Sequence, residues 1–381
     1  MMTWRDGVVH AVGNRWPGAV EIEVRLTVSS GHEPARGEMV RALAYPELVG
    51  EPEPGDRVLV STTALSRDLG TGGYAFVVAR PDTLPDDPPA GPGHIMKARY
   101  TPLQTMVLGV DEQESPAHEV LRDADDIAGM PVVIADLHSA LPAILAGARY
   151  EASRLGRPVP SVAYLMTDGG ALPAWFSRTV AVLREVGWLQ ATITVGQAFG
   201  GDLEAVTVHS GLLAAHLVTH ADFVVVAQGP GNLGTGTRWG FSGVAAGEAV
   251  NAAATLGGRP VASLRVSGAD PRERHRGISH HSMTAYGRVA LCPADIAVPV
   301  LAGELTDLGA QVQRQAGALA SRHRLVPVPT GGLLDALAQA PVRLSTMGRG
   351  LADDPGSFLA AAVAGVHAAR LVAGHQGGEP S

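Results

Sequence analysis

Cysteine is almost absent from this chain of 381 residues, which contains only Cys292. A single thiol excludes an intramolecular disulfide and a zinc site built from cysteines. Aromatic residues make up only 4% of the chain, whereas glycine (47) and proline (27) are abundant. The core must therefore consist mainly of Ala, Val and Leu, with backbones in close contact.

Lysine is equally scarce, since Lys97 is the only one and nearly every positive charge is an arginine. The net charge of −8 argues against a nucleic-acid partner, which would require a basic face. In so arginine-rich a chain, an isolated arginine is a weak sign of a binding site.

Targeting and membrane-spanning patterns are also missing. Residues 1–12 lack the charged and then apolar segments of a signal peptide. The most apolar late stretch, 358–373, contains His367 and Arg370 and is too short to span a bilayer. We therefore expect a cytoplasmic protein with no membrane partner, and we leave the oligomeric state open, a homo-oligomer included.

The first part of the chain is rich in predicted strands. Residues 20–28 alternate strictly between apolar and polar, and 58–60 and 74–79 predict further short strands. A proline-rich stretch at 81–92 indicates a loop. We predict a smaller β-rich, barrel-like N-terminal domain at 1–128, ending in a polar segment.

From Met130 the pattern changes to alternating strands and helices. The predicted strands are 132–135, 162–166, 192–195, 223–227, 261–266, 325–328 and 342–345, and the predicted helices are 172–186, 242–256, 303–321 and 357–373. Such alternation is typical of a mostly parallel sheet with flanking helices. We therefore predict an α/β ligand-binding domain at 129–381.

The apolar run 223–227 leads directly into a glycine-rich loop. Ligands of open α/β sheets bind beyond the carboxyl ends of the strands, and glycines expose backbone N–H groups that suit an anion. We predict that this loop binds the ligand through Gly229, Gly231, Asn232, Gly234, Thr235 and Gly236.

The loop matches G-x-G-x-x-G, but no helix opens at once and no acidic residue ends the next strand, so the dinucleotide fingerprint is incomplete. Without a following lysine it is not a P-loop either. Two interpretations remain: a loop for an anion or polar ligand, or glycines required only by a tight crossing of the backbone.

A second loop, 267–282, gathers arginines and histidines. Arginines bind carboxylates or phosphates with paired hydrogen bonds, and histidines move protons near neutral pH. We predict that Arg272 and Arg274 bind the ligand and that His280 and His281 are catalytic. The alternative is a solvated loop whose arginines pair with acids of their own or of a neighbouring subunit.

His138 and Asp168 follow two other predicted strands, and we predict that they too are catalytic, with Asp168 orienting or ligating. Asp136, His138 and Asp168 would suit a divalent ion, whereas an Asp before two glycines also commonly caps a helix or shapes a turn. A Ser-His-Asp hydrolase lacks its G-x-S-x-G turn here. We assign no metal ligands and leave the cofactor open.

Two segments, QGPGNLGTGTRWGFSG (228–243) and RHRGISHHSMTAYGRV (274–289), resemble a family of unknown function found in Gram-positive bacteria. That resemblance covers most of the α/β part and implies no activity.

Three further features resemble the proprotein subunit of component B of the glycine/sarcosine/betaine reductases. They are a β-rich front followed by a glycine-led strand holding 100–102, the segment 162–166 opening an α/β unit, and 224–226 running into a glycine loop. Those subunits cleave themselves at a cysteine to form a pyruvoyl group, but the matching region 196–211 contains no cysteine. The resemblance implies a scaffold and a small polar substrate, without pyruvoyl chemistry.

Together these patterns favour a cytoplasmic small-molecule enzyme, or enzyme-like protein, acting on an anionic or amino-acid-like ligand. The alternative is a non-catalytic binding or regulatory protein on a reductase-like scaffold. The missing cysteine favours the alternative, whereas the His and Asp residues at strand ends favour an enzyme. The sequence leaves open whether the protein is catalytic.

Overall fold

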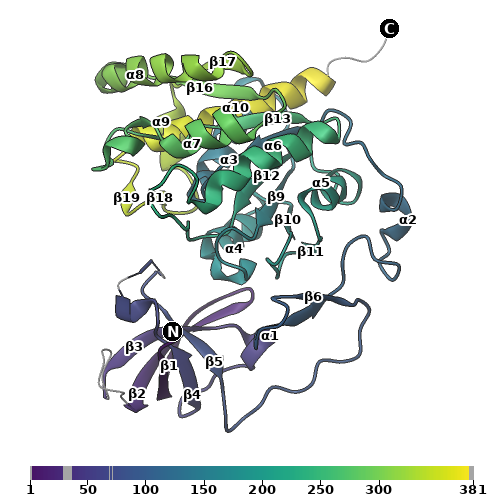
Figure 1. The fold of residues 1–381 in the computed structure, drawn as a ribbon, viewed down its shortest axis with the longest axis vertical. Coiled ribbons are helices and arrows are strands. Elements are labelled where there is room, and N and C mark those ends of the chain that lie inside the picture. Colours follow the sequence, from purple (N-terminus) through teal and green to yellow (C-terminus); the bar gives the residue numbers. More distant parts are fainter. Residues whose placement is uncertain (1, 29–36, 68, 71, 377–381) are drawn as a thin grey trace. The chain divides into compact units, whose positions relative to one another are not determined.

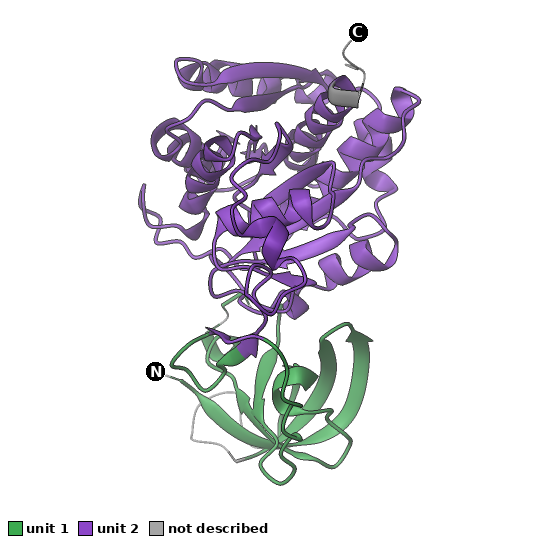
Figure 2. Ribbon diagram, turned by 90° about the vertical axis from the view of Figure 1, so that its right-hand side faces the viewer, with its two compact units in different colours: residues 1–92, 98–105 green, residues 93–97, 106–381 purple. Residues whose placement is uncertain are grey.

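The computed structural model describes residues 2–28, 37–67, 69–70 and 72–376. Its chain divides into two compact units, which Figure 2 shows in separate colours. The first unit comprises Met1–Pro92 with Ala98–Thr105, and the second comprises Gly93–Lys97 with Met106–Ser381. Residues 93–97 and 106–128, which the sequence analysis grouped with the N-terminal domain, belong to the second unit in this division.

The first unit is a closed five-stranded barrel with the strand order β1-β2-β3-β5-β4, which confirms the predicted barrel-like domain. On β2, Ile22, Val24 and Leu26 are fully buried, as the alternating sequence predicts. The elements of this unit are β1 (Trp4–Trp16), β2 (Ala19–Val28), β3 (Met39–Ala44), α1 (Pro46–Val49), β4 (Arg57–Ser61), η1 (Leu65–Arg67) and β5 (Ala75–Ala79).

The second unit contains an eight-stranded sheet in the order β11-β10-β9-β12-β8-β13-β16-β17, and each neighbouring pair is parallel (Figure 1). The predicted parallel α/β architecture is therefore confirmed. The strands are β8 (Pro131–Ile134), β9 (Val162–Thr167), β10 (Ala191–Thr194), β11 (Leu203–Glu204), β12 (Phe223–Gln228), β13 (Arg259–Ser263), β16 (Asp295–Val300) and β17 (Arg324–Pro329).

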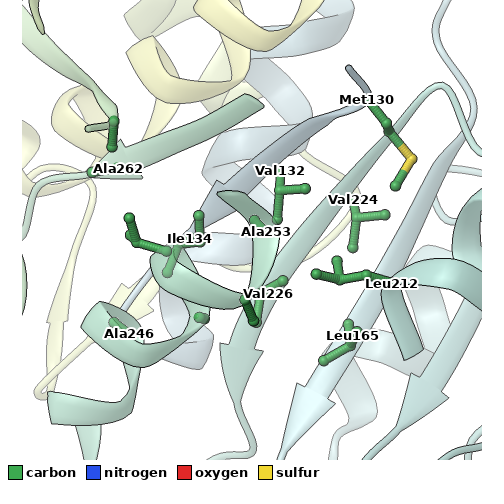
Figure 3. Packing of buried hydrophobic residues seen from close by; sticks show 14 of the residues in the cluster. Met130, Val132, Ile134, Leu165, Leu212, Val224, Val226, Ala246, Ala253 and Ala262 are labelled. Atoms are coloured by element: carbon green, nitrogen blue, oxygen red, sulfur yellow. The ribbon is translucent and has the colours of Figure 1, made fainter. Parts of the chain in front are cut away.

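Helices cover both faces of this sheet because successive strand residues point to opposite sides. Val132 and Ile134 belong to one buried cluster, whereas Val133 belongs to the other. Figure 3 shows the first cluster, where Val132, Val224 and Leu212 lie together. On that face pack α5 (Val208–Leu217), α6 (Ala245–Thr255) and α8 (Thr306–Ala316), and on the other α3 (Leu141–Arg154), α4 (Arg178–Glu185), α9 (Leu333–Ala338) and α10 (Pro355–Gln376).

The order of the strands creates a switch point in the middle of the sheet. The chain runs outwards from β8 to β11 and then returns to β12, which lies directly beside β8. The connection after β8 passes through α3 on one face, whereas the connection after β12 passes through α6 on the other. Connections that leave in opposite directions open a crevice at the carboxyl ends of the strands.

Helix α10 is the core helix of this unit. Its window Pro355–Gly374 is long and apolar enough to cross a membrane, but 78% of it is buried inside the structure. The backbones of α10 and α3 touch where Gly365 faces Ile144 and Gly147 faces Ala362, with no space for a Cβ at either glycine. This close packing is possible because the helix is rich in Ala and Gly.

The only lysine fastens a separate segment to the sheet. Lys97 ends β6 (Ile95–Lys97), and its side chain is 1% exposed. Its Nζ lies 2.8 Å from Oε2 of Glu204 and 2.7 Å from the carbonyl oxygen of Ala198. The carbonyl oxygens of Thr194 and Ala205, at 3.1 and 3.0 Å, complete the enclosure.

Three local predictions were wrong. The strand β16, with the sequence DIAVPV, was not among the predicted strands. The predicted strand 342–345 lies outside the main sheet, where only β18 (Ser345–Thr346) pairs with β19 (Arg349–Gly350). The predicted glycine-led strand around Tyr100 is a turn instead, with Tyr100 at a φ of +64°.

Candidate functional site

Buried polar residues collect at the switch point of the sheet. Asp136 follows β8 and is 4% exposed, and Gln228 ends β12 and is 5% exposed. Nε2 of Gln228 donates to the carbonyl oxygen of Asp136 at 3.0 Å and to Oδ1 of Asn232 at 3.1 Å. The loops after β8 and β12 are thus joined at the place where α/β sheets bind ligands.

Asp136 faces two basic side chains. Its Oδ2 lies 3.8 Å from Nη1 of Arg265 and 3.7 Å from Nδ1 of His281, and it is buried without a hydrogen-bond partner among the described residues. Arg265 instead donates from Nη1 to Nδ1 of His281 at 3.0 Å. The ring of Phe241 stacks on His281 with a centroid separation of 3.8 Å and fixes the plane of the imidazole.

Three histidines form a compact cluster beside this pair. The ring centroids of His275 and His280 are 4.9 Å apart, those of His275 and His281 5.0 Å, and those of His280 and His281 4.4 Å. Nδ1 of His275 lies 2.7 Å from Oγ of Ser279. Nε2 of His280 is buried and has no partner in the part of the chain that the structure describes.

The start of a short helix brings the histidines together. The side chain of Ser279 accepts a hydrogen bond from the backbone N–H of His281 and so caps α7 (His280–Thr284). Adjacent residues on a helix are about 100° apart, whereas on a strand they would face opposite sides. His280 and His281 therefore both reach His275, which ends the preceding turn η5 (Glu273–His275).

Burial keeps two of these imidazoles, those of His275 and His280, neutral. It lowers the pKa of His275 to about 3, and the positive charges of Arg265 and Arg272 lower it in the same direction. Burial likewise lowers the pKa of His280 to about 4, with further contributions from His281 and Arg274. At neutral pH, His275 and His280 each have an unprotonated nitrogen that is able to accept a proton or bind a metal.

An open groove with positive charge lies directly beside His280. Arg238 comes from the glycine loop, Arg274 from η5, and Arg288 from the π-helical turn η6 (Ala285–Val289). The groove contains no carboxylate, since its lining residues are Arg238, Arg274, His280, Met283, Thr284, Gly287, Arg288, Ala318 and Leu319.

The glycine loop forms a small hairpin rather than a buried cradle. The N–H of Thr235 donates to the carbonyl of Gly240 at 2.7 Å, and the N–H of Gly229 donates to Thr167 at 3.1 Å. Oδ1 of Asn232 accepts from the hydroxyl of Ser242 at 2.8 Å. Gly231, Gly234, Thr235 and Gly236 are exposed.

The tip of this hairpin approaches the groove. Gly236 has a φ of +80°, and a Cβ built on it would lie 3.6 Å from Nη2 of Arg274. Asn232 and Gly229 therefore hold the loop in shape, whereas Gly236 and Arg238 are the loop residues placed near Arg274 and His280.

Arg272 lies in a different environment from Arg274. It donates two hydrogen bonds of 2.9 Å to Asp270, which also accepts from Arg349 at 3.1 Å. The hydrogen bonds from Arg272 hold the pKa of Asp270 well below its usual range. Arg272 is thus engaged in an ion pair within its own loop, whereas the exposed Arg274 lines the groove.

His138 and Asp168 lie apart from the histidine cluster. His138 binds Tyr164, whose ring belongs to the α3–α10 face, at 3.0 Å and Ser177 at 2.7 Å. Asp168 is exposed and accepts the N–H of Gln197 at 2.9 Å, which shapes the turn after β10.

The predicted site residues did not include Arg265, His275, Phe241, Arg238 or Arg288. Two sequence signals pointed towards part of this set. Arg265 stands just beyond the end of β13, as Asp136 does beyond β8. His275 shares a short segment with His280 and His281. Phe241 carries no such signal, because its contact with His281 depends on how two distant loops pack.

The fold and this site define an α/β protein with a buried Asp–Arg–His group and a basic groove at the switch point of its sheet. The family model for a protein of unknown function (DUF3866) matches residues 41–365, so the chain belongs to that family. Comparisons with curated proteins and with solved structures found no match.

Proposed function

We propose that the second unit binds a small anion in the groove beside His280. The observation that carries this proposal is the groove itself, which Arg238, Arg274 and Arg288 line from three separate segments and which no carboxylate of the described residues lines. Guanidinium groups bind carboxylates and phosphates through charge-assisted hydrogen bonds, which are about twice as strong as neutral ones. A protein with a net charge of −8 attracts such a ligand only where positive charge is concentrated.

We further propose that the protein is a cytoplasmic enzyme acting on an anionic or amino-acid-like ligand, with no nucleic-acid or membrane partner. In the metal-free protein, His280 lines the groove and is neutral, so it is able to accept a proton from a bound molecule. A bound anion would raise the pKa of His280 towards neutrality, because a nearby negative charge favours the imidazolium. Binding of the anionic ligand would thereby make His280 a stronger base.

A non-catalytic binding or regulatory protein on a reductase-like scaffold is the second candidate. Ser210 is the hydroxyl nearest to where the reductase subunits carry their cysteine, and it forms a capping box with Thr207 at the start of α5. Its hydroxyl therefore stabilises a helix, which favours a scaffold without self-cleavage chemistry.

The groove is tested by calorimetric titration of the metal-stripped protein with inorganic phosphate and with glutamate. We expect Arg274→Ala and Arg288→Ala each to weaken binding by roughly tenfold, in keeping with about 1.5 kcal/mol for one charged hydrogen bond. Arg314→Ala removes an exposed arginine of α8 outside the groove lining and serves as the matched control. If the groove variants bind both anions as tightly as the control, the proposal is wrong.

A further inference from the structure

We propose that His275, His280 and His281 form a binding site for a divalent transition-metal ion, and that Zn²⁺ suits it best. Each residue offers one ring nitrogen, and these nitrogens lie within 4.8 Å of one another. Around tetrahedral Zn²⁺, with Zn–N distances of 2.0–2.1 Å, ligand nitrogens are about 3.3 Å apart. Binding of the ion therefore requires the nitrogens to approach one another by up to about 1.5 Å, the difference between 4.8 and about 3.3 Å.

Two buried atoms in this group lack a partner among the described residues: Nε2 of His280 and Oδ2 of Asp136. A buried polar atom in a native structure is normally satisfied, so its exceptions require an explanation. An ion bound by the histidines accepts the lone pair of His280. With the ion bound, Asp136 would accept a hydrogen bond from the second ring N–H of the metal-bound His281.

Neighbouring groups are placed to orient the ligands. Metal-binding histidines usually donate their second N–H to a carboxylate or another acceptor. Oδ2 of Asp136 lies 3.7 Å from Nδ1 of His281, and Oγ of Ser279 lies 2.7 Å from Nδ1 of His275. These acceptors leave Nε2 of His281 and of His275 for the ion. Arg265, 3.8 Å from Asp136, moves from His281 onto that carboxylate when the ion binds.

The chemistry of the ligands fits a borderline cation. Neutral imidazoles suit Zn²⁺, Cu²⁺, Fe²⁺ and Ni²⁺, whereas Mg²⁺ and Ca²⁺ prefer oxygen. Burial keeps His275 and His280 in the unprotonated form that binds metals. Three protein ligands leave a fourth position open, as in catalytic zinc sites. His280 also lines the arginine groove, so the metal site adjoins the groove, and this last point rests on the proposed function.

The experiment uses the full chain without a polyhistidine tag, stripped with EDTA and dialysed. We expect calorimetry to show one Zn²⁺ bound per chain and Co²⁺ to give the visible absorption bands of a four-coordinate site. His280→Ala should abolish the stoichiometric site. Asp136→Asn should keep the stoichiometry and weaken the affinity by roughly 10–100-fold, as expected for a group that orients a ligand.

His209→Ala is the matched control, since His209 is an exposed histidine on α5 outside the cluster. Circular dichroism checks that each variant is folded, and His280→Gln replaces His280→Ala if the latter is not. Absence of stoichiometric Zn²⁺ binding, or unchanged binding by the His280 variant, would overturn the proposal.

The outcomes for the metal and for the anion are separable. Arg274→Ala and Arg288→Ala should still bind Zn²⁺, because neither side chain belongs to the histidine cluster. Zn²⁺ binding by a protein that binds neither phosphate nor glutamate contradicts the proposed function alone. Anion binding by a protein that binds no Zn²⁺ contradicts the metal site alone.

Discussion

His138 is a half-buried histidine with a partner on each ring nitrogen. Nε2 of His138 lies 2.7 Å from Oγ of Ser177, which also accepts the N–H of Val180. The hydroxyl of Tyr164 donates to the backbone carbonyls of β12, and it therefore accepts from Nδ1 of His138. These hydrogen bonds join the turn after β8 to the start of α4, a structural role that the sequence did not reveal.

Acidification should weaken the fold through His138. Burial lowers its pKa from 6.5 to about 4, so between these values the unfolded chain binds the proton and the folded chain does not. The stability contributed by neutral His138 is complete above about pH 6.5 and is lost as the pH falls towards 4, by about 3 kcal/mol at most. Urea unfolding of the parent and of His138→Gln, near neutral pH and about pH 4, measures this contribution.

The comparison between the two proteins isolates His138, because every other titrating group is common to both. We expect the difference in unfolding free energy to shrink on acidification. A difference that stays constant across this range would mean that folding does not lower the pKa of His138.

At the scale of single residues, the sequence could predict that polar side chains follow the strands but not what each of them contacts. Arg272 and Arg274 are two positions apart and equally plausible as ligands. Asp270 accepts hydrogen bonds from Arg272, whereas Arg274 has no such partner among the described residues of this loop and lines the groove. Such choices depend on the path of the backbone and on partners from distant segments, which a pattern of residue types does not contain.

Among the elements, α3 and α10 show how closely this alanine- and glycine-rich chain packs. We expect Gly365→Ala to destabilise the protein by about 1–3 kcal/mol, since the new methyl group would overlap the backbone of Ile144. An alanine is otherwise favoured over glycine inside a helix by about 1 kcal/mol. Denaturant unfolding monitored by circular dichroism gives the sign directly.

Gly374→Ala in the same helix is the control, because a Cβ there has open space around it. It should be neutral or slightly stabilising. If both variants stabilise the protein alike, α3 and α10 do not pack as closely as described.

Most strands of the sheet were predictable because their sequences are continuous apolar runs, as the buried β8 and β12 show. Their carboxyl ends share one edge because the strands are parallel, so the place of the site was also predictable. The errors were the omission of β16, which contains a charged residue and a proline, and the strand predicted at 342–345, where an alternating apolar and polar segment lies outside the main sheet.

For the whole molecule, we expect the chain to remain a single polypeptide. The region 196–211 has no cysteine, and its Ser210 is held in the capping box of α5. Intact-mass spectrometry of freshly purified and of aged protein should show one species of the full mass. Two fragments separated within 196–211 would instead indicate self-cleavage and restore the reductase chemistry.

Lys97 has a practical consequence for anyone handling this protein. Its amine is the only one on a side chain of this sequence, and four oxygen atoms enclose it inside the second unit. While the unit is folded, no lysine is accessible to an acylating dye, an amine cross-linker, an acetyltransferase or a ubiquitin ligase. Labelling or immobilisation through side chains therefore has to use carboxylates or the half-buried thiol of Cys292. Reaction of Lys97 with an amine reagent would itself report that this region has opened.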